Sequence, residues 1–248
     1  MSESPEVIKK LIEDCSLEDR KALKAYLRAL MPHPLESEWG IDAATILSAI
    51  SRSSDLTKRG VRGIIAEAVF VNDVVPNIAT SGWESVPITG DLSYDALFKK
   101  GELSARIQIK LQRMEKGVPK LYYPKLHNEE VLFVVEVQKT RSGVRRTVKK
   151  LQGARTEVTA TSALTVKTRP YRFGDFDILA VNMHPSSGDW KSFRYTLGSW
   201  LRPRSKDSTL IEIFQPVAAT PNNVWTDDIA ECLGWLVAGE KRQLLPDF

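Results

Sequence analysis

The sequence is poor in cysteine and histidine, the residues on which many metal sites and covalent catalysts are built. Its 248 residues include two cysteines and three histidines. Cys15 and Cys232 lie far apart in the sequence, so they form neither a disulfide framework nor a paired zinc motif. No Cys/His couple indicates covalent catalysis, and free thiols are typical of a reducing compartment. We therefore expect a cytoplasmic protein.

Several signatures of other protein classes are also missing. No apolar run approaches the ~20 residues that a membrane helix needs, and the first residues lack the pattern of a signal peptide. No Gly-x-x-x-x-Gly-Lys loop predicts a nucleotide cofactor, and no Gly-x-Ser-x-Gly elbow predicts a serine hydrolase. We therefore expect an ordinary globular protein that has no membrane partner and no nucleotide cofactor.

Positive charge is concentrated in the middle of the chain. Residues 99–172 contain 18 Lys and Arg against 6 Asp and Glu, a local charge of +12, whereas the remainder carries −8 and the whole chain +4. Such a local field is what binding to a phosphate backbone requires. A basic surface that is merely solvated is the alternative. The position of the field, around the candidate site described next, favours nucleic acid.

The strongest local pattern is a predicted hairpin over residues 94–111, with Gly101 at its turn. In its second strand apolar and polar residues alternate, so that Gln108 and Lys110 share one face and the isoleucines the other. The turn brings this strand back alongside Asp95. An acid, an amide oxygen and an ammonium group at one sheet edge suit a divalent cation that activates water against a phosphodiester.

This arrangement resembles the PD-(D/E)XK nuclease superfamily, in its variant with Gln at the third position. Asp95 matches the first acid of the motif, Gln108 the acid-or-Gln position, and Lys110 the final lysine. Such nucleases often carry a further Glu on a preceding helix, and Glu67 stands where it would fall. The resemblance covers roughly residues 60–185 and includes the order helix, hairpin and further strand.

The resemblance implies a Mg²⁺-dependent endonuclease on double-stranded DNA, most simply a type II restriction enzyme that leaves 5′-phosphate ends. Asp95 and Glu67 would bind Mg²⁺ with the Gln108 amide oxygen as a weaker ligand, and Lys110 would activate the attacking water. A palindromic target implies a homodimer. Because Gln108 replaces an acid, a catalytically inactive DNA-binding module with the same fold is the alternative.

A second strand competes for the catalytic role. Residues 131–138 form an apolar run that ends in Glu136 and Gln138, which period two places on one face. Lys139 falls on the other face, and no acid begins a strand shortly before this one. We interpret it as the strand next to the catalytic one, with Glu136 and Gln138 facing the same cleft, and keep it as the rival site.

A basic segment without acidic residues follows that strand. Its charged residues are predicted to contact DNA, through phosphates or through an arginine in a groove. They are Lys139, Arg141, Arg145, Arg146, Lys149, Lys150 and Arg155.

We predict an α/β protein in which helices flank a mixed central β-sheet, a restriction endonuclease-like fold. Residues 1–58 are predicted to form an N-terminal helical lobe, and residues 59–248 the PD-(D/E)XK-like nuclease domain. The lobe is interpreted as a structural or dimer-forming element, with DNA contact as the alternative. A helix over residues 58–72 is expected to leave Glu67 off its buried stripe. The residues of that stripe are Val61, Ile64, Ile65, Ala68 and Val69.

Overall fold

A computed structural model describes residues 4–90, 92–122, 131–138, 144–145, 164–165 and 170–244. The chain divides into two compact units, Met1–Gly60 and Val61–Phe248. Helix α5 (Asp55–Val69) runs across this division. The boundary at residue 58 stays a prediction, and each unit is described by itself.

The N-terminal unit is helical, and polar side chains cap some of its helices. The side chain of Ser16 caps its second helix by accepting a hydrogen bond from the Asp19 N–H at 3.1 Å. Asp42 caps the fourth by accepting from the Thr45 N–H at 2.9 Å. The helices are α1 (Pro5–Asp14), α2 (Leu17–Leu30), α3 (Pro34–Trp39) and α4 (Ala43–Arg52).

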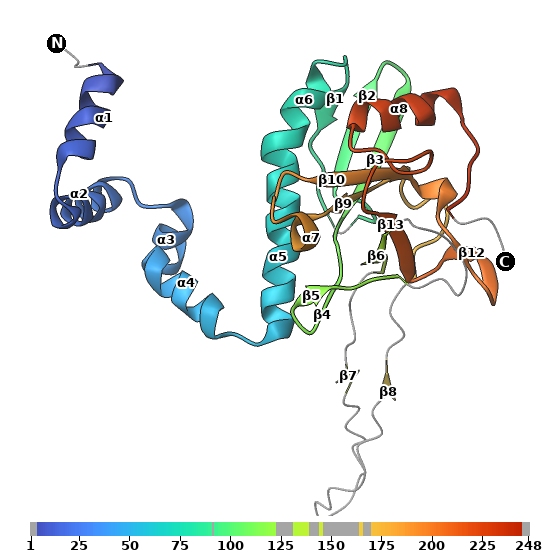
Figure 1. Cartoon of the computed structure of the whole chain (residues 1–248), viewed down its shortest axis with the longest axis horizontal. Helices are drawn as coiled ribbons and strands as arrows, with labels where there is room; N and C mark the ends of the chain where they lie inside the picture. The colour runs from blue at the N-terminus through green and yellow to red at the C-terminus, as the bar shows by residue number, and fades with distance from the viewer. Residues whose placement is uncertain are drawn as a thin grey trace, which may run out of the picture. The chain divides into compact units, whose positions relative to one another are not determined.

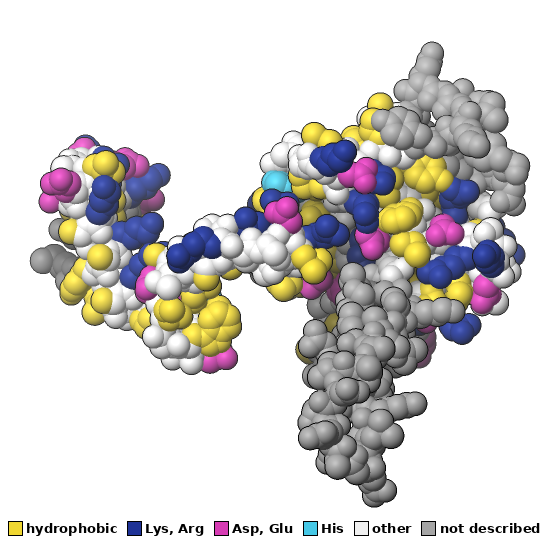
Figure 2. Space-filling model, turned by 90° about the horizontal axis from the view of Figure 1, so that it is seen from below, with side chains coloured by type: hydrophobic (Ala, Val, Ile, Leu, Met, Phe, Trp, Pro, Cys, Tyr) yellow, Lys and Arg dark blue, Asp and Glu magenta, His cyan; other side chains and the backbone are white. Residues whose placement is uncertain are grey.

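Helices α1–α4, all within the described residues, contain no buried residue. Large apolar side chains lie on the surface of this unit instead, where Figure 2 shows patches of yellow. These residues are Val7, Ile8, Leu11, Leu17, Tyr26, Leu27, Leu30, Met31, Trp39, Ile41, Leu47 and Leu56. Exposed apolar patches of this kind are typical of a protein contact site.

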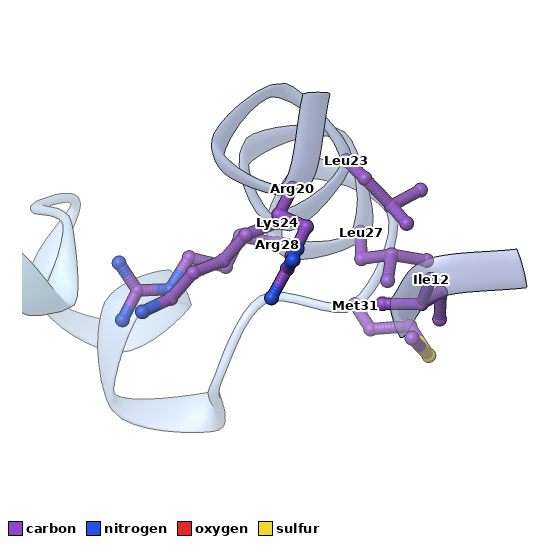
Figure 3. A pocket seen from close by; sticks show the side chains of 7 residues that line it. All are labelled: Ile12, Arg20, Leu23, Lys24, Leu27, Arg28 and Met31. Atoms are coloured by element: carbon purple, nitrogen blue, oxygen red, sulfur yellow. The ribbon is translucent and has the colours of Figure 1, made fainter. Parts of the chain in front are cut away.

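A pocket of about 380 Å³ lies on helix α2 and the neighbouring part of α1 (Figure 3). Its apolar and basic side chains separate: the apolar ones gather on one side and the basic ones extend the other way. The apolar residues are Ile12, Leu23, Leu27 and Met31, and the basic ones are Arg20, Lys24 and Arg28.

The larger unit is built on a five-stranded sheet with the order β1-β2-β3-β9-β10 (Figure 1). Its strands are β1 (Glu84–Val86), β2 (Ala96–Lys100), β3 (Leu103–Leu111), β9 (Ile178–Asn182) and β10 (Phe193–Leu197). Neighbouring strands are antiparallel except β3 and β9, which run parallel with Ile107 opposite Ile178. The sheet is therefore mixed and flanked by helices, which confirms the predicted fold class.

Helices cover one face of this sheet. They are the second half of α5, the π-helix η1 (Phe70–Val74), α6 (Val75–Ala79) and α8 (Ile229–Ala238). Phe70 and Leu233 from these helices pack in one core cluster with Ile107 and Ile109 of β3. This packing confirms the predicted alternation in β3, because the isoleucines face the helices and leave Gln108 and Lys110 on the opposite face.

A strand pair covers part of that opposite face. Strands β6 (Leu132–Glu136) and β13 (Phe214–Ala218) are antiparallel to each other. Val135 and Val217 from this pair share a second core cluster with Leu179 and Val181 of β9. The register sets Gln108 beside Leu179 and Lys110 beside Val181. The polar residues of β3 therefore lie at the margin of a buried apolar layer.

The remaining elements are short. They are β4 (Met114–Glu115), β5 (Val118–Pro119), β7 (Val144–Arg145), β8 (Leu164–Thr165), α7 (His184–Ser187), η2 (Gly198–Trp200), β11 (Pro203–Arg204) and β12 (Asp207–Ile211). Across the described segments, no helix combines the length and the apolar character that a bilayer crossing demands.

The predicted rotation of the helix that carries Glu67 is wrong. Ile64 is 64% exposed and Ile65 37%, whereas Ala66 and Phe70 are fully buried. The ring of Phe70 packs edge-on against Phe193, with ring centroids 5.7 Å apart. Because this large aromatic residue decides which side of α5 meets the sheet, the helix turns the side with Ala66 inward and brings its neighbour Glu67 with it.

The predicted place of the rival strand is also wrong. Strand β6 was expected beside the catalytic strand, but the neighbours of β3 in the sheet are β2 and β9. Strand β6 lies in the second layer, because its apolar residues on both faces allow it to cover the sheet rather than extend it. It touches the end of β3 through an isolated bridge between Gln112 and Val135.

Candidate active site

The hairpin of β2 and β3 fixes Asp95 immediately before β2. Its N–H donates to the Ile107 carbonyl at 2.8 Å, which continues the ladder by one residue. Its Oδ2 accepts a hydrogen bond from the Ile109 N–H at 2.8 Å. The carboxylate is therefore held against the backbone of β3, beside the side chain of Gln108.

Gln108 is 1% exposed and its amide is satisfied on both sides. The amide nitrogen donates to Asp95 Oδ2 and to the Ile109 carbonyl, the latter at 3.2 Å. The amide oxygen accepts a hydrogen bond from the Tyr171 hydroxyl at 2.9 Å. In this orientation the nitrogen rather than the oxygen faces the carboxylate, so the oxygen that was predicted as a ligand is turned toward Tyr171.

Lys110 extends from the same face of β3, two residues further on. Its Nζ lies 5.8 Å from the centroid of the Tyr171 ring, within the range of a cation–π interaction. Tyr171 thus contacts both polar residues of the strand. This tyrosine was not predicted from the sequence, because no local pattern indicates a contact between positions 63 residues apart.

Glu67 reaches the site from helix α5. Burial raises the pKa of its carboxyl group above the usual range, the negative charge of Asp95 raises it further, and the positive charge of Lys110 lowers it. These mutual effects require the three charged groups to lie near one another. The structure therefore brings together the four residues of the predicted catalytic set: Glu67, Asp95, Gln108 and Lys110.

The donor set suits a hard cation. Two carboxylates and an amide are the oxygen ligands that Mg²⁺ binds in proteins, usually together with waters. In the described part of the chain, no three His, Cys, Asp or Glu side chains gather into a metal site. Any cation here would thus depend on Gln108 or on backbone and water oxygens to supplement Glu67 and Asp95.

An ion pair next to the site ties β3 to the start of β9. Asp177 Oδ1 accepts from Arg106 Nη2 at 2.7 Å. Its Oδ2 accepts from the Nε and the backbone N–H of Arg106 at 2.9 Å and 2.8 Å. This bidentate contact directly precedes Ile107, where the parallel register begins, and so it stabilises the alignment that carries Gln108 and Lys110.

The rival residues have other surroundings. Glu136 forms an ion pair with Arg113, whose guanidinium carbon lies 5.0 Å from the ring centroid of Phe214. Gln138 Oε1 is buried and, within the described residues, has no hydrogen-bond partner. Glu136 alternates along β6 with Val135, which faces the second core cluster. The contacts of Glu136 thus lead toward β13 and Arg113, and its catalytic role stays a prediction.

The predicted DNA-binding segment lies almost entirely outside the described residues. Arg145 belongs to the short strand β7, of which the backbone pairing with β8 is described. The other predicted contacts fall outside: Lys139, Arg141, Arg146, Lys149, Lys150 and Arg155. Figure 2 shows Lys and Arg side chains of the larger unit mixed with acidic and apolar ones on the visible face.

Replacing Glu67 by Gln should raise the melting temperature of the cation-free protein at about pH 8. The folded-state pKa of Glu67 is raised, so the fold loses stability as the pH rises from the ordinary value of 4.5 to that pKa, and a neutral amide removes the cost. Below the ordinary value of 4.5 the wild-type group is already neutral, and the difference should vanish. Thermal unfolding in EDTA measures the melting temperature, which shifts by roughly 2–4 °C for each kcal/mol of change in the free energy of unfolding.

Glu102→Gln is the matched control, since Glu102 lies exposed at the turn of the hairpin. It should leave the melting temperature unchanged across the same pH range. Equal melting of Glu67→Gln and the wild type at every pH would show that Glu67 is not buried beside Asp95.

Comparison with known proteins gives little. No protein-family profile matches the chain, and no curated protein matches it either. A solved structure that aligns with the chain is that of a bacterial homing endonuclease, I-Ssp6803I. It is 16% identical in sequence, and the alignment covers 66% of this chain and 79% of that one with a TM-score of 0.37.

Proposed function

We propose that this protein is a Mg²⁺-dependent endonuclease that hydrolyses phosphodiester bonds of double-stranded DNA, most simply as a site-specific type II restriction enzyme. The observation that carries the proposal is the convergence of Glu67, Asp95, Gln108 and Lys110 around β3, the central strand of the sheet. These are the residue types that cation-assisted phosphodiester hydrolysis uses. The sequence around them supplies the positive field that DNA binding needs.

In this proposal each residue has a separate task. A bound Mg²⁺ would supply Lewis-acid stabilisation of the phosphate and a more acidic water. Asp95 and Glu67 would hold it with carboxylate oxygens, Asp95 from a position fixed by the Ile109 N–H. Lys110 would orient the attacking water, help to remove its proton, and stabilise the negative charge that develops on the phosphate.

A catalytically inactive DNA-binding module is the second candidate, and one observation favours it. The Gln108 amide donates to Asp95 and accepts from Tyr171, so this part of the site is satisfied without a cation. A protein that had lost cleavage could retain such a site as a purely structural network.

Incubation of plasmid DNA with and without Mg²⁺ separates the two candidates. Discrete fragments that form only with Mg²⁺ support a site-specific endonuclease, and their pattern reports the recognition site. A smear of fragments would contradict site specificity. Intact plasmid that is nevertheless retarded in a gel would support the inactive DNA-binding module. Asp95→Asn is the control, because it removes the carboxylate while keeping the side-chain shape.

We also propose that the enzyme acts as a homodimer through its N-terminal unit. Residues 1–60 contain 9 Lys and Arg against 10 Asp and Glu, so this unit lacks the positive field that DNA contact needs. Its helices α1–α4 leave many of their apolar side chains exposed, among them Leu27 at the pocket of Figure 3. A twofold dimer would cover this surface and match a palindromic site. Analytical ultracentrifugation of the same protein preparation measures its molecular mass, which distinguishes a dimer from a monomer.

A further inference from the structure

Tyr171 is held rigidly beside the candidate site. Its side chain is 3% exposed, and its ring packs edge-on against Phe176 with ring centroids 5.4 Å apart. Its carbonyl accepts a hydrogen bond from the Ile211 N–H at 2.9 Å, which fixes its backbone to β12. A buried tyrosine with a fixed ring and backbone presents its hydroxyl at one defined place.

That place lies against both polar residues of β3. The hydroxyl donates to Gln108 Oε1 at 2.9 Å, and the ring centroid lies 5.8 Å from Lys110 Nζ. Tyrosine combines a hydroxyl, which can both donate and accept a hydrogen bond, with an aromatic face that suits the contact with Lys110. In the proposed reaction Tyr171 would therefore act through Gln108 and Lys110.

The hydroxyl can serve Gln108 in either orientation of its amide. As the structure stands, the amide nitrogen donates to Asp95 and the oxygen accepts from Tyr171. If the amide turns over, its oxygen faces the Asp95 carboxylate and its nitrogen faces the tyrosine. Two oxygens facing each other repel unless a cation lies with them, whereas the hydroxyl can switch from donating to accepting. A phenylalanine could do neither.

We infer that Tyr171 is a positioning residue that lets Gln108 change from capping Asp95 in the cation-free protein to presenting its oxygen when Mg²⁺ binds. This inference rests on the proposed function, since it names the residue that prepares the same site. Its consequence is specific: the hydroxyl of Tyr171 sets the Mg²⁺ requirement, and the chemical step at saturating Mg²⁺ does not depend on it.

Tyr171→Phe tests this, because it deletes the hydroxyl and keeps the ring beside Lys110. Deleting the hydroxyl removes one hydrogen bond from each orientation, and the larger loss falls on the Mg²⁺-bound one, where the cation polarises the amide that donates to the hydroxyl. Calorimetric titration of the DNA-free protein with Mg²⁺ should therefore show affinity weakened by roughly two- to tenfold, the difference between a charge-assisted and a neutral hydrogen bond. The side-chain amide signals of Gln108 in an NMR spectrum should respond to Mg²⁺ at correspondingly higher concentrations. The cleavage rate should return to within about twofold of wild type when Mg²⁺ is saturating.

Tyr195→Phe is the matched control. Tyr195 is also 3% exposed, but it lies in the core cluster on the opposite face of the sheet. Tyr195→Phe also removes a buried hydroxyl, but it should leave the Mg²⁺ affinity and the NMR signals of the Gln108 amide unchanged. Equal effects of the two variants would show general loosening of the fold and overturn the inference.

The remaining outcomes separate this inference from the proposed function. A wild-type protein that neither binds Mg²⁺ nor cuts DNA overturns both. If the wild type binds Mg²⁺ and cuts, but Tyr171→Phe has unchanged Mg²⁺ affinity, the inference alone is overturned. A rate loss in Tyr171→Phe that saturating Mg²⁺ cannot restore also overturns it, because the hydroxyl would then act on the chemical step.

Discussion

Replacing Lys110 by Ala should lower the cleavage rate by roughly 10²- to 10⁴-fold, the usual contribution of a positioned acid–base group. DNA affinity, measured with Ca²⁺ in place of Mg²⁺, should stay nearly the same. The reason is that Lys110 stabilises charge that develops only in the transition state and adds little to the ground-state complex. Single-turnover cleavage and a filter-binding titration on the same DNA measure the two quantities separately.

Lys99→Ala is the control for the loss of one positive charge. Lys99 is exposed on β2 of the same sheet, opposite Glu84 and away from Gln108. It should cut DNA at close to the wild-type rate. Undiminished cutting by Lys110→Ala would remove β3 from contention as the catalytic strand.

A second pair of variants tests whether the catalytic residues lie on β3 or on the rival strand β6. Asp95→Asn should stop cleavage through lost cation binding, whereas Glu136→Gln should cost only what the Arg113 ion pair contributes to stability. That pair is partly exposed, so its contribution is small, about 0–1 kcal/mol. An inactive Glu136→Gln beside an Asp95→Asn that still cuts would transfer the site to β6.

The polar face of β3 was predictable because its information is local. Alternation of apolar and polar residues with period two needs only consecutive positions, and the hairpin closes at a glycine. Gly101 has φ +58°, a left-handed conformation that glycine adopts without strain. Ile107 and Ile109 consequently face the helices, and Gln108 and Lys110 face the other way.

The parts that were not predictable depend on distant contacts. Helix α5 has several apolar residues on more than one side, and the choice between them is made by the fit of Phe70 against Phe193. The partner of Asp177 is 71 residues away in Arg106, and that of Gln108 is 63 residues away in Tyr171. Pairings over such separations leave no periodic trace in a single sequence, so composition and pattern could not identify them.

Replacing Arg145, Arg146, Lys149 and Lys150 together by Ala should reduce the salt dependence of DNA binding. Each phosphate contact contributes about 0.9 to the slope of log affinity against log salt concentration, so four lost contacts flatten it by up to roughly 3.6. Lysine and arginine release counterions when they neutralise phosphates, and alanine cannot. Binding isotherms at several salt concentrations, with specific and non-specific DNA of equal length, measure the slope.

A second set of four substitutions provides the control and tests the N-terminal unit. Lys9, Lys10, Lys21 and Arg59 are exposed and carry the same total charge. Their replacement by Ala should leave the slope unchanged if this unit contacts protein rather than DNA. A flattened slope in this control would instead place the N-terminal helices on the phosphate backbone.

The two DNAs distinguish how the basic segment contacts its target. If its side chains contact only phosphates, the four substitutions weaken binding to both DNAs alike, because the backbone carries no sequence information. A larger loss on the specific DNA would place an arginine in the major groove, where one bidentate contact to guanine discriminates by about 1–3 kcal/mol. An unchanged slope on both DNAs would mean that the segment faces away from DNA, and the concentration of positive charge over residues 99–172 would then need another partner.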